Sequence, residues 1–231
     1  MSEGWRAFWN RDTPIYVSER HKALHYRGVA DDIAALVPHA QAVVLDHGCG
    51  EALCADRVAG ACARLLLLDA APLVRGRLEA RFADHPGIAV IAPDDLAGLG
   101  DGSLDLVVAN SLAQYLTRDE LSGLLAVWRA KLKPGGRLVL ADILPPDLGA
   151  LTDAGALLAF AARGGFVPAA LAGLARTAFS DYRRLRGALG LARYAPDAML
   201  ALLASAGYRA RRLPRNLGHN QNRLAFEAMP A

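Results

Sequence analysis

The stretch Val43-Val44-Leu45-Asp46-His47-Gly48-Cys49-Gly50 joins an apolar run to an acid and then to a Gly-x-Gly turn. A continuous apolar run is typical of a buried parallel strand. Glycines directly after such a strand let the backbone turn sharply and approach a ligand closely. The stretch therefore predicts the first strand of a parallel sheet, with a ligand-binding turn at its carboxyl end.

A second apolar run, Leu65 to Leu68, ends in another acid, Asp69. An acid at the tip of the strand that follows a glycine turn can hold the two hydroxyl groups of a ribose. The two runs together predict a pocket for a ligand that contains adenosine.

Strand and helix patterns alternate along the middle of the chain. Apolar runs predict strands at 42–46, 64–69, 88–92, 104–109 and 137–142, and helical patterns predict helices at 51–59, 72–82 and 118–132. Two further strand patterns, 208–213 and 223–228, flank a polar loop near the end of the chain. This rhythm predicts an α/β fold, a doubly wound sheet.

The other segments read as helices. Residues 3–38 are expected to be helical with a break at Thr13-Pro14, and 196–205 forms another helix. After Pro145-Pro146, two helices are expected at 151–162 and 167–191, separated by Gly164-Gly165. We therefore expect one domain with four parts: a helical cap (1–38), a core (41–143), a helical insertion (146–195) and a C-terminal helix and hairpin (196–231).

Composition limits the possible classes of protein. The chain has 231 residues, of which 53% are apolar and 21% charged, and its formal net charge is +3. We find no apolar window long enough for a membrane span and no apolar leader at the N-terminus. The basic cluster at 209–215 lacks interleaved aromatic residues, so a nucleic-acid partner is not expected. Heavy use of alanine and arginine suggests a GC-rich bacterial genome.

The three cysteines, Cys49, Cys54 and Cys62, are clustered and odd in number. This pattern argues against a disulfide framework and favours a reducing, cytoplasmic compartment. None of the spacings is Cys-x-x-Cys, so we expect no metal site.

Three details of the glycine turn indicate which adenosine ligand fits. A nicotinamide site needs a third glycine, and Leu53 stands at that position. The chain lacks the Gly-Lys-Ser/Thr of a phosphate loop. Glu51, expected as the first residue of a helix, would repel a phosphate. These details favour S-adenosylmethionine, which carries adenosine and no phosphate.

Residues 41–143 resemble the core of the class I S-adenosylmethionine-dependent methyltransferases. Four runs carry the resemblance in the family's order: Val-Leu-Asp-His-Gly-Cys-Gly-Glu-Ala (44–52), Leu-Leu-Asp-Ala (67–70), Asp-Gly-Ser-Leu-Asp-Leu-Val (101–107) and Leu-Lys-Pro-Gly-Gly-Arg-Leu-Val-Leu (132–140). It implies a Rossmann-like seven-stranded sheet in the order 3-2-1-4-5-7-6 with the last strand antiparallel. Two departures are Ala52, which replaces a common glycine and is expected on a helix, and Pro93-Asp94-Asp95.

The resemblance also implies roles for the cofactor-binding residues. Asp46 and the Gly48-Cys49-Gly50 backbone would face the methionyl end of S-adenosylmethionine. Asp69 would hold the ribose, and Ala70 would lie beside the adenine. His47 is expected to be a packed histidine and Cys49 a small turn residue.

Further contacts are implied farther along the chain. Asp94 or Asp95 would accept a hydrogen bond from the adenine amino group, with the backbone N–H of Leu96 nearby. Asn110 and Ser111, at the tip of the fourth strand, would lie near the sulfonium.

The acceptor side is less defined by sequence. The loop 216–222 is expected at the ligand-binding edge of the sheet, where His219 is the candidate base; the alternative is an ordinary solvated turn. Tyr16, Arg20 and Tyr26 lie in a segment that resembles a cap over the cofactor, with an ordinary packing helix as the alternative. The resemblance implies that the insertion is the substrate-specific part. Its apolar residues are expected to pack on the core; the alternatives are that they line a pocket for the acceptor or that a helix of the insertion lies on a membrane surface.

The predicted activity is methyl transfer to a small or apolar acceptor, lipid-like molecules included, with S-adenosylhomocysteine as product. The sequence Asn110-Ser111-Leu112-Ala113 lacks the motif of relatives that methylate adenine or glutamine amides. Two alternatives remain open: a nicotinamide-dependent oxidoreductase and a non-catalytic protein that binds S-adenosylmethionine.

Overall fold

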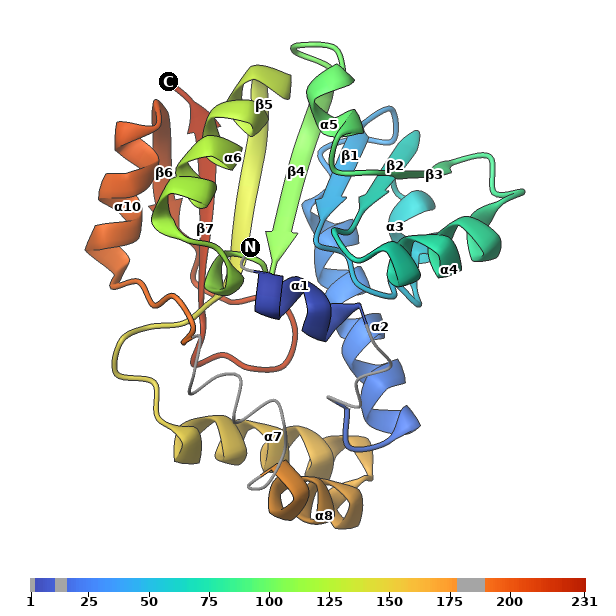
Figure 1. Ribbon diagram of the computed structural model, residues 1–231, viewed down its shortest axis with the longest axis vertical. Coiled ribbons are helices and arrows are strands. Elements are labelled where there is room, and N and C mark those ends of the chain that lie inside the picture. Colours follow the sequence, from blue (N-terminus) through green and yellow to red (C-terminus); the bar gives the residue numbers. More distant parts are fainter. Residues whose placement is uncertain (1–2, 11–15, 178–189) are drawn as a thin grey trace.

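Seven strands form one sheet in the order β3-β2-β1-β4-β5-β7-β6 in the computed structural model, which describes residues 3–10, 16–177 and 190–231 (Figure 1). The strands are β1 (Val43–His47), β2 (Arg64–Leu68), β3 (Ile88–Ile91), β4 (Leu104–Asn110), β5 (Leu132–Ile143), β6 (Tyr208–Arg212) and β7 (Leu224–Pro230). Strands β1 to β5 are parallel, and β7 is antiparallel to both β5 and β6. The sheet order and the antiparallel last strand predicted from the sequence are confirmed.

Helices cover both faces of this sheet because successive residues of its buried strands point to opposite sides. On β1, Val44 packs into one core and Leu45 into the other. The core around Val44 includes residues of α2 (Glu19–Leu36), α3 (Ala55–Ala59) and α4 (Pro72–Phe82). The core around Leu45 includes residues of α5 (Asp95–Gly98), the 3-10 turn η1 (Ala113–Tyr115), α6 (Arg118–Lys131) and α10 (Pro196–Ser205).

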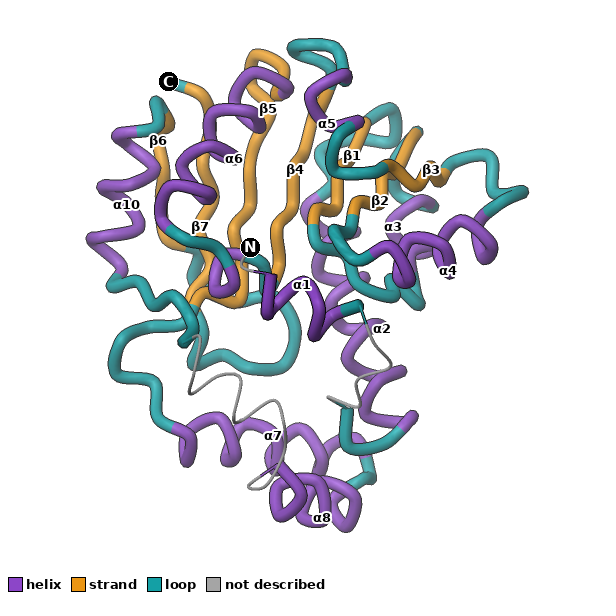
Figure 2. The backbone as a smooth tube through the Cα atoms, in the orientation of Figure 1, coloured by secondary structure: helices purple, strands orange, loops and turns teal. Residues whose placement is uncertain are grey.

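The inserted helices gather at the end of the sheet toward which β4 points. Helices α7 (Ala150–Gly164) and α8 (Val167–Thr177) lie beyond that end, together with part of α2 and with α1 (Glu3–Trp9) (Figures 1 and 2). Gly165, at φ 71°, ends α7 in the left-handed conformation that glycine adopts without strain. Of the second inserted helix expected at 167–191, residues 178–189 lie outside the described residues, as do 1–2 and 11–15 of the cap. Gly190 and Leu191 are described and are not helical, so the predicted end of that helix is wrong.

The helix expected at 51–59 is shorter than the sequence pattern predicts, because α3 begins only at Ala55. Ala52 has a φ of 41°, so it occupies a turn and not a helix. The Tyr26 hydroxyl accepts a hydrogen bond from the Glu51 N–H at 3.0 Å, and Lys22 pairs with the Glu51 carboxylate at 2.6 Å. These contacts hold the turn open, and the argument that Glu51 repels phosphate from a helix terminus is therefore wrong.

Two other boundaries differ from the sequence prediction. The Pro134-Gly135-Gly136 turn falls inside β5, which begins at Leu132, and a shift in strand register between Leu104 and Leu106 accommodates it. The short helix α5 follows β3 where no helix was predicted. Among residues 3–10, 16–177 and 190–231, no helix combines the length and the apolar character needed to span a bilayer.

Candidate functional site

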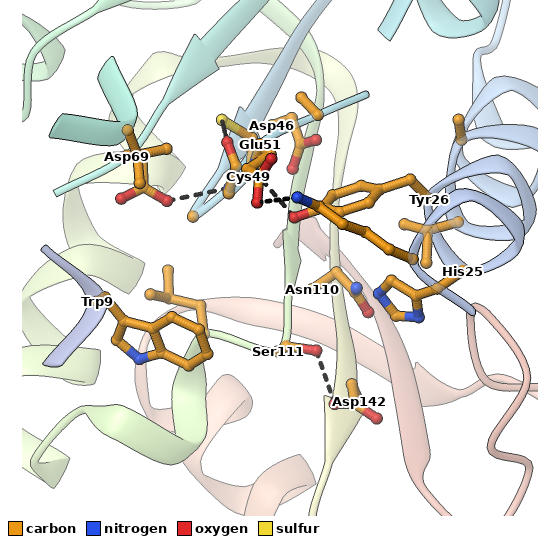
Figure 3. A pocket seen from close by; sticks show the side chains of 18 of the residues that line it. Trp9, His25, Tyr26, Asp46, Cys49, Glu51, Asp69, Asn110, Ser111 and Asp142 are labelled. Atoms are coloured by element: carbon orange, nitrogen blue, oxygen red, sulfur yellow. Dashed lines mark hydrogen bonds and ion pairs between the residues drawn. The ribbon is translucent and has the colours of Figure 1, made fainter. Parts of the chain in front are cut away.

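A cavity of about 1180 Å³ opens at the carboxyl ends of the central strands. It exceeds the range of roughly 300–1,000 Å³ for common ligand pockets, so it has room for more than one small molecule. Its lining combines the glycine turn after β1, the tips of β2, β4 and β5, helices α1, α2 and α8, and the loop between β6 and β7 (Figure 3). Eleven of the residues predicted from sequence meet there: Tyr16, Tyr26, Asp46, Gly48, Cys49, Gly50, Asp69, Ala70, Asn110, Ser111 and His219.

The glycine turn is held by backbone hydrogen bonds to the neighbouring strand. The N–H groups of Gly48 and Cys49 donate to the carbonyl oxygen of Leu68 at 2.7 and 3.2 Å. Gly48 has a φ of 80°, and a Cβ there would lie 3.2 Å from the Leu112 side chain. Only glycine fits this conformation without strain, so the turn presents bare backbone to the cavity.

The Asp69 carboxylate connects this turn to the end of β2. Its Oδ2 accepts from the Gly50 N–H at 3.0 Å and its Oδ1 from the Ala71 N–H at 2.8 Å. Each carboxylate oxygen can accept more than one hydrogen bond, so capacity remains for ligand hydroxyl groups. Burial raises the pKa of Asp69 even though these two N–H groups and Arg75 favour its ionised form.

Asp46 lies on β1, two residues before Gly48 of the same turn. Burial, and then the nearby Asp69 carboxylate, raise its pKa to about 7. A carboxyl that is half protonated near neutral pH would lose its proton when a cation binds beside it. Asp46 is therefore suited to a ligand that carries an ammonium group.

Tyr26 joins helix α2 to the turn. Its hydroxyl accepts from Glu51, and its ring lies 5.7 Å from that of Tyr16 between centroids. Burial raises the pKa of Tyr26 to about 12, so the phenol stays protonated. Arg20 is exposed and bonds the carbonyl oxygen of Gly164, so it ties α2 to α7 and is not among the described residues that line the cavity.

Two strained residues stand at the tips of β4 and β5. Ser111 has a φ of 57° and Asp142 a φ of 58°, and the Ser111 hydroxyl donates to Asp142 Oδ2 at 2.6 Å. Left-handed backbone at residues other than glycine is costly and gathers at functional sites. Sequence reasoning missed Asp142, although an acid directly after an apolar strand was the signal that had identified Asp46 and Asp69.

Unpartnered polar atoms gather around this cavity. Five buried side-chain polar atoms in the described residues lack a hydrogen-bond partner, and four of them belong to residues of the cavity lining: Trp9 Nε1, Asn110 Oδ1, Gln114 Oε1 and His219 Nδ1. Buried polar groups are normally paired, so this concentration marks a place for a bound molecule. Trp9 and Gln114 had no motif in the sequence to single them out.

His219 lies on the cavity, as the sequence predicts, and stacks on Phe160 at 4.2 Å between ring centroids. Burial and the neighbouring His21 lower its pKa to about 4, so the imidazole is neutral at physiological pH. A neutral imidazole can accept a proton or a hydrogen bond.

Other predicted cofactor residues lie outside the cavity. Asp94, Asp95 and Leu96 are not among the described residues that line it, and both acids are exposed. The Asp95 carboxylate accepts from the Ala92 N–H at 2.8 Å, which closes the turn that starts α5.

His47 and Cys49 behave as structural residues. His47 Nδ1 accepts from Trp128 Nε1 at 3.2 Å, and burial lowers its pKa to about 4. Burial raises the pKa of the Cys49 thiol, and all three cysteines are free. Within the described part of the chain, no three His, Cys, Asp or Glu side chains are arranged to hold a metal ion.

Comparison with known proteins finds a family that part of this chain resembles. Residues 44–136 match the methyltransferase domain family. An uncharacterized methyltransferase of Mycobacterium tuberculosis is 34% identical over 128 residues, which cover 54% of this chain and 61% of the relative. Chondramide synthase of Chondromyces crocatus is 31% identical over 147 residues, which cover 61% of this chain and 4% of that protein. The match therefore spans less than two thirds of the mycobacterial relative.

Among solved structures, the fold is similar to magnesium protoporphyrin IX methyltransferase from Synechocystis PCC 6803 with bound S-adenosylhomocysteine. The TM-score is 0.61 at 18% identity, covering 99% of this chain and 94% of that chain. Sheet order, glycine turn and the match over residues 44–136 make the chain similar to the class I S-adenosylmethionine-dependent methyltransferases.

Proposed function

We propose that the chain transfers a methyl group from S-adenosylmethionine to a small or apolar acceptor, lipid-like molecules included. One observation carries the proposal: the glycine turn and its two carboxylates open into the same cavity as the inserted helix α8 and His219. A donor held at the turn and an acceptor held beyond it would share one cavity.

The residues present fit S-adenosylmethionine. Asp46 faces the cavity with a pKa of about 7, as suits the amino group of the methionyl end. Asp69 keeps acceptor capacity for the ribose hydroxyls, and the unpartnered Asn110 Oδ1 lies at the tip of β4. The magnesium protoporphyrin IX methyltransferase of the same fold was solved with the demethylated product bound, which supports the choice.

Bound there, S-adenosylmethionine supplies a methyl group on a sulfonium, which is a good leaving group. The chain's own residues then have to hold donor and acceptor in line and exclude water. Gly48 and Gly50 let the backbone approach the donor, while Tyr26 fixes the turn through Glu51. Tyr16, Tyr26 and helix α8 line the same cavity and would face the bound donor.

Calorimetry on the full chain tests the proposal. We expect S-adenosylmethionine and S-adenosylhomocysteine each to bind at one site. Failure of both to bind would contradict the proposal, and quenching of nicotinamide fluorescence on titration would instead support an oxidoreductase. Methyl transfer to an acceptor panel, followed by mass spectrometry, separates an enzyme from a non-catalytic binding protein.

We further propose that the chain forms one domain, in which residues 146–195 are a substrate-determining insertion on the core at 41–143. The short α7–α8 connection and the contact of Arg20 with Gly164 support this division. The three free thiols support a reducing, cytoplasmic compartment.

A further inference from the structure

Asp142 stands at the tip of β5, one strand farther along the sheet than Asn110 and Ser111 at the tip of β4. All three residues line the cavity, and Asn110 pairs in register with Ala141, directly before Asp142 (Figure 3). Two strand spacings, or about 10 Å, separate β5 from β1 and its glycine turn. If the proposed function holds, and this inference rests on it, the donor occupies the tips of β2 and β1. Asp142 then lies beyond the donor, on the acceptor side of β4.

The Asp142 carboxylate keeps hydrogen-bonding capacity for a ligand. The Ser111 hydroxyl donates to its Oδ2 at 2.6 Å, and Arg223 lies 3.6 Å from the same oxygen. Each carboxylate oxygen can accept more than one hydrogen bond, so a further donor can be accommodated. Burial raises the pKa of Asp142, whereas Arg223 and Ser111 favour its ionised form. A cation bound beside this carboxyl would favour the ionised form further.

Arg223 balances the negative charge of Asp142 only in part, because a second carboxylate shares it. Asp153 on α7 accepts from Arg223 Nη2 through both carboxylate oxygens, each at 3.0 Å. Within the described residues, two carboxylates therefore share one guanidinium. This end of the cavity has an excess of negative charge, which attracts a positively charged group.

The other cations of the cavity lining do not neutralise this carboxylate by direct pairing. Lys22 pairs with Glu51 at 2.6 Å, beside the glycine turn, and Arg176 is exposed on α8. No described ion pair of Asp142 includes any of the three remaining cations of the lining, which are Lys22, Arg77 and Arg176.

The histidines of the lining add no positive charge. Burial, and then the neighbouring His219 and His21, lower the pKa of His25 to about 3. Burial, and then His21, lower the pKa of His219 to about 4, and burial also lowers the pKa of His21. All three imidazoles are neutral near physiological pH, so they do not repel a cationic ligand.

Two amide oxygens near the tip of β4 lack hydrogen-bond donors. Asn110 Oδ1 and Gln114 Oε1 are buried without a partner. Gln114 is 7% exposed and lies on η1, which contacts β5. Together with the Asp142 carboxylate, these oxygens call for several donors from one ligand. A hydroxyl group supplies one donor, whereas a primary amine supplies two and its ammonium form three.

We infer that the methyl acceptor is a primary amine, that its N–H groups donate to Asp142 and to the unpartnered amide oxygens, and that Asp142 stabilises the positive charge that the nitrogen gains. The bound ammonium first gives one proton to water. The nitrogen lone pair then forms the bond to the methyl carbon, and the carbon–sulfur bond breaks with its electron pair left on sulfur. The positive charge passes from sulfur to nitrogen, where a fixed carboxylate stabilises it.

The experiment uses the full chain with 2-phenylethylamine as probe, 2-phenylethanol as a matched alcohol and 3-phenylpropanoate as a matched anion. Calorimetry measures the binding of each to the chain loaded with S-adenosylhomocysteine. Mass spectrometry measures methyl transfer from S-adenosylmethionine. The test variant is Asp142→Asn. Its control is Asp105→Asn, because Asp105 is a buried acid paired with Lys133 near the opposite end of β4.

We expect the amine to bind at least about ten-fold more tightly than the alcohol or the anion, and to be methylated in preference to the alcohol. Asp142→Asn should keep affinity for S-adenosylhomocysteine within about two-fold, abolish the preference for the amine, and lower its methylation by at least about 100-fold. Asp105→Asn should leave affinity, preference and methylation within about two-fold of the unmodified chain.

Preference of the unmodified chain for the alcohol or the anion, or no binding of the amine, would overturn the inference without any variant. Unchanged preference in Asp142→Asn, or an equal loss in Asp105→Asn, would overturn it as well. Absence of S-adenosylhomocysteine binding would instead remove the proposed function, and this inference with it. Calorimetry before any acceptor is added therefore distinguishes the two failures.

Discussion

The two halves of the cavity are built in different ways. The donor half, residues 43–71, is a short segment in which backbone N–H groups of the glycine turn are held by Leu68 and Asp69. The acceptor half consists of side chains brought together from α2, α8 and the loop between β6 and β7, with His21 and His219 near opposite ends of the chain.

This difference in construction separates the part of the cavity that would bind the cofactor from the part that would bind the substrate. A backbone site depends on a few glycines and acids at defined spacings, so it changes little as the surrounding residues vary. A side-chain site depends on which rings each distant segment contributes. In the proposed function, the donor half therefore defines the class of reaction, and the acceptor half selects the substrate.

The largest effect is expected from Gly48→Val. The φ of 80° is unfavourable for a β-branched residue, and the new side chain would meet Leu112. We expect affinity for S-adenosylhomocysteine, measured by calorimetry, to fall by at least about 100-fold. Gly102→Val is the matched control, because Gly102 has a φ of 62° with nothing within 4 Å of a Cβ. If both variants lost the same affinity for S-adenosylhomocysteine, the effect would come from backbone strain and not from the position of Gly48 in the cavity.

Asp69→Ala should have the next largest effect. We expect affinity for S-adenosylhomocysteine, again measured by calorimetry, to fall by about 10- to 100-fold. This corresponds to about 1–3 kcal/mol, the cost of leaving buried polar groups unpaired. It removes the acceptor of the Gly50 and Ala71 N–H groups as well as the predicted ribose contact. Asp94→Ala and Asp95→Ala should change affinity by less than about two-fold, since both acids are exposed outside the cavity. If either variant lost more affinity than this, that result would support the adenine contact expected for that acid from the sequence.

A smaller effect is expected from pH. The pKa of Asp46 is raised to about 7, so this carboxyl is mostly protonated at pH 6 and mostly ionised at pH 8. Only the ionised form attracts the amino group of the cofactor, so affinity should rise by up to about ten-fold from pH 6 to pH 8.

Asp46→Asn isolates this contribution, because the pKa of Asp69 is also raised by burial. The variant should bind more weakly and lose most of the pH dependence. A pH profile as steep as that of the unmodified chain would assign the titration to Asp69.

The smallest effect on the donor half should come from Phe160→Ala, a residue that lies behind the acceptor half. Phe160 is half-buried behind His219, and its loss should lower the free energy of unfolding by about 1–2 kcal/mol in urea denaturation. Affinity for S-adenosylhomocysteine should stay within about two-fold. A larger change in affinity would show that the two halves are coupled through α2.

The fold was predictable because its signals are local. Continuous apolar strands alternating with helices predicted the parallel sheet, and four motifs predicted the strand order that the structure confirms. The errors arose where distant contacts override local pattern. Tyr26 and Lys22 on α2 hold Glu51 and its turn, so α3 starts later than its helical pattern suggests.

For the candidate site, as for the fold, residues with a local sequence signal were predictable and residues placed by distant contacts were not. Asp46, Asp69 and the glycines were identified because each ends or follows an apolar run of sequence. Asp142 follows the same rule and was overlooked, whereas Trp9 and Gln114 carry no local signal. Arg20 was placed in the right segment, but it points to α7, because the orientation of a helical side chain depends on how the helix packs.

By itself the sequence determined the sheet, the glycine turn and the acids at the strand tips, because strand burial and positive φ are properties of short segments. Only the tertiary structure decided which side chains face the shared cavity. It brought His25 to within 6.0 Å of His219 between ring centroids and stacked His219 on Phe160, contacts between residues far apart in the chain. Such contacts follow from the packing of whole elements, and no local pattern records them.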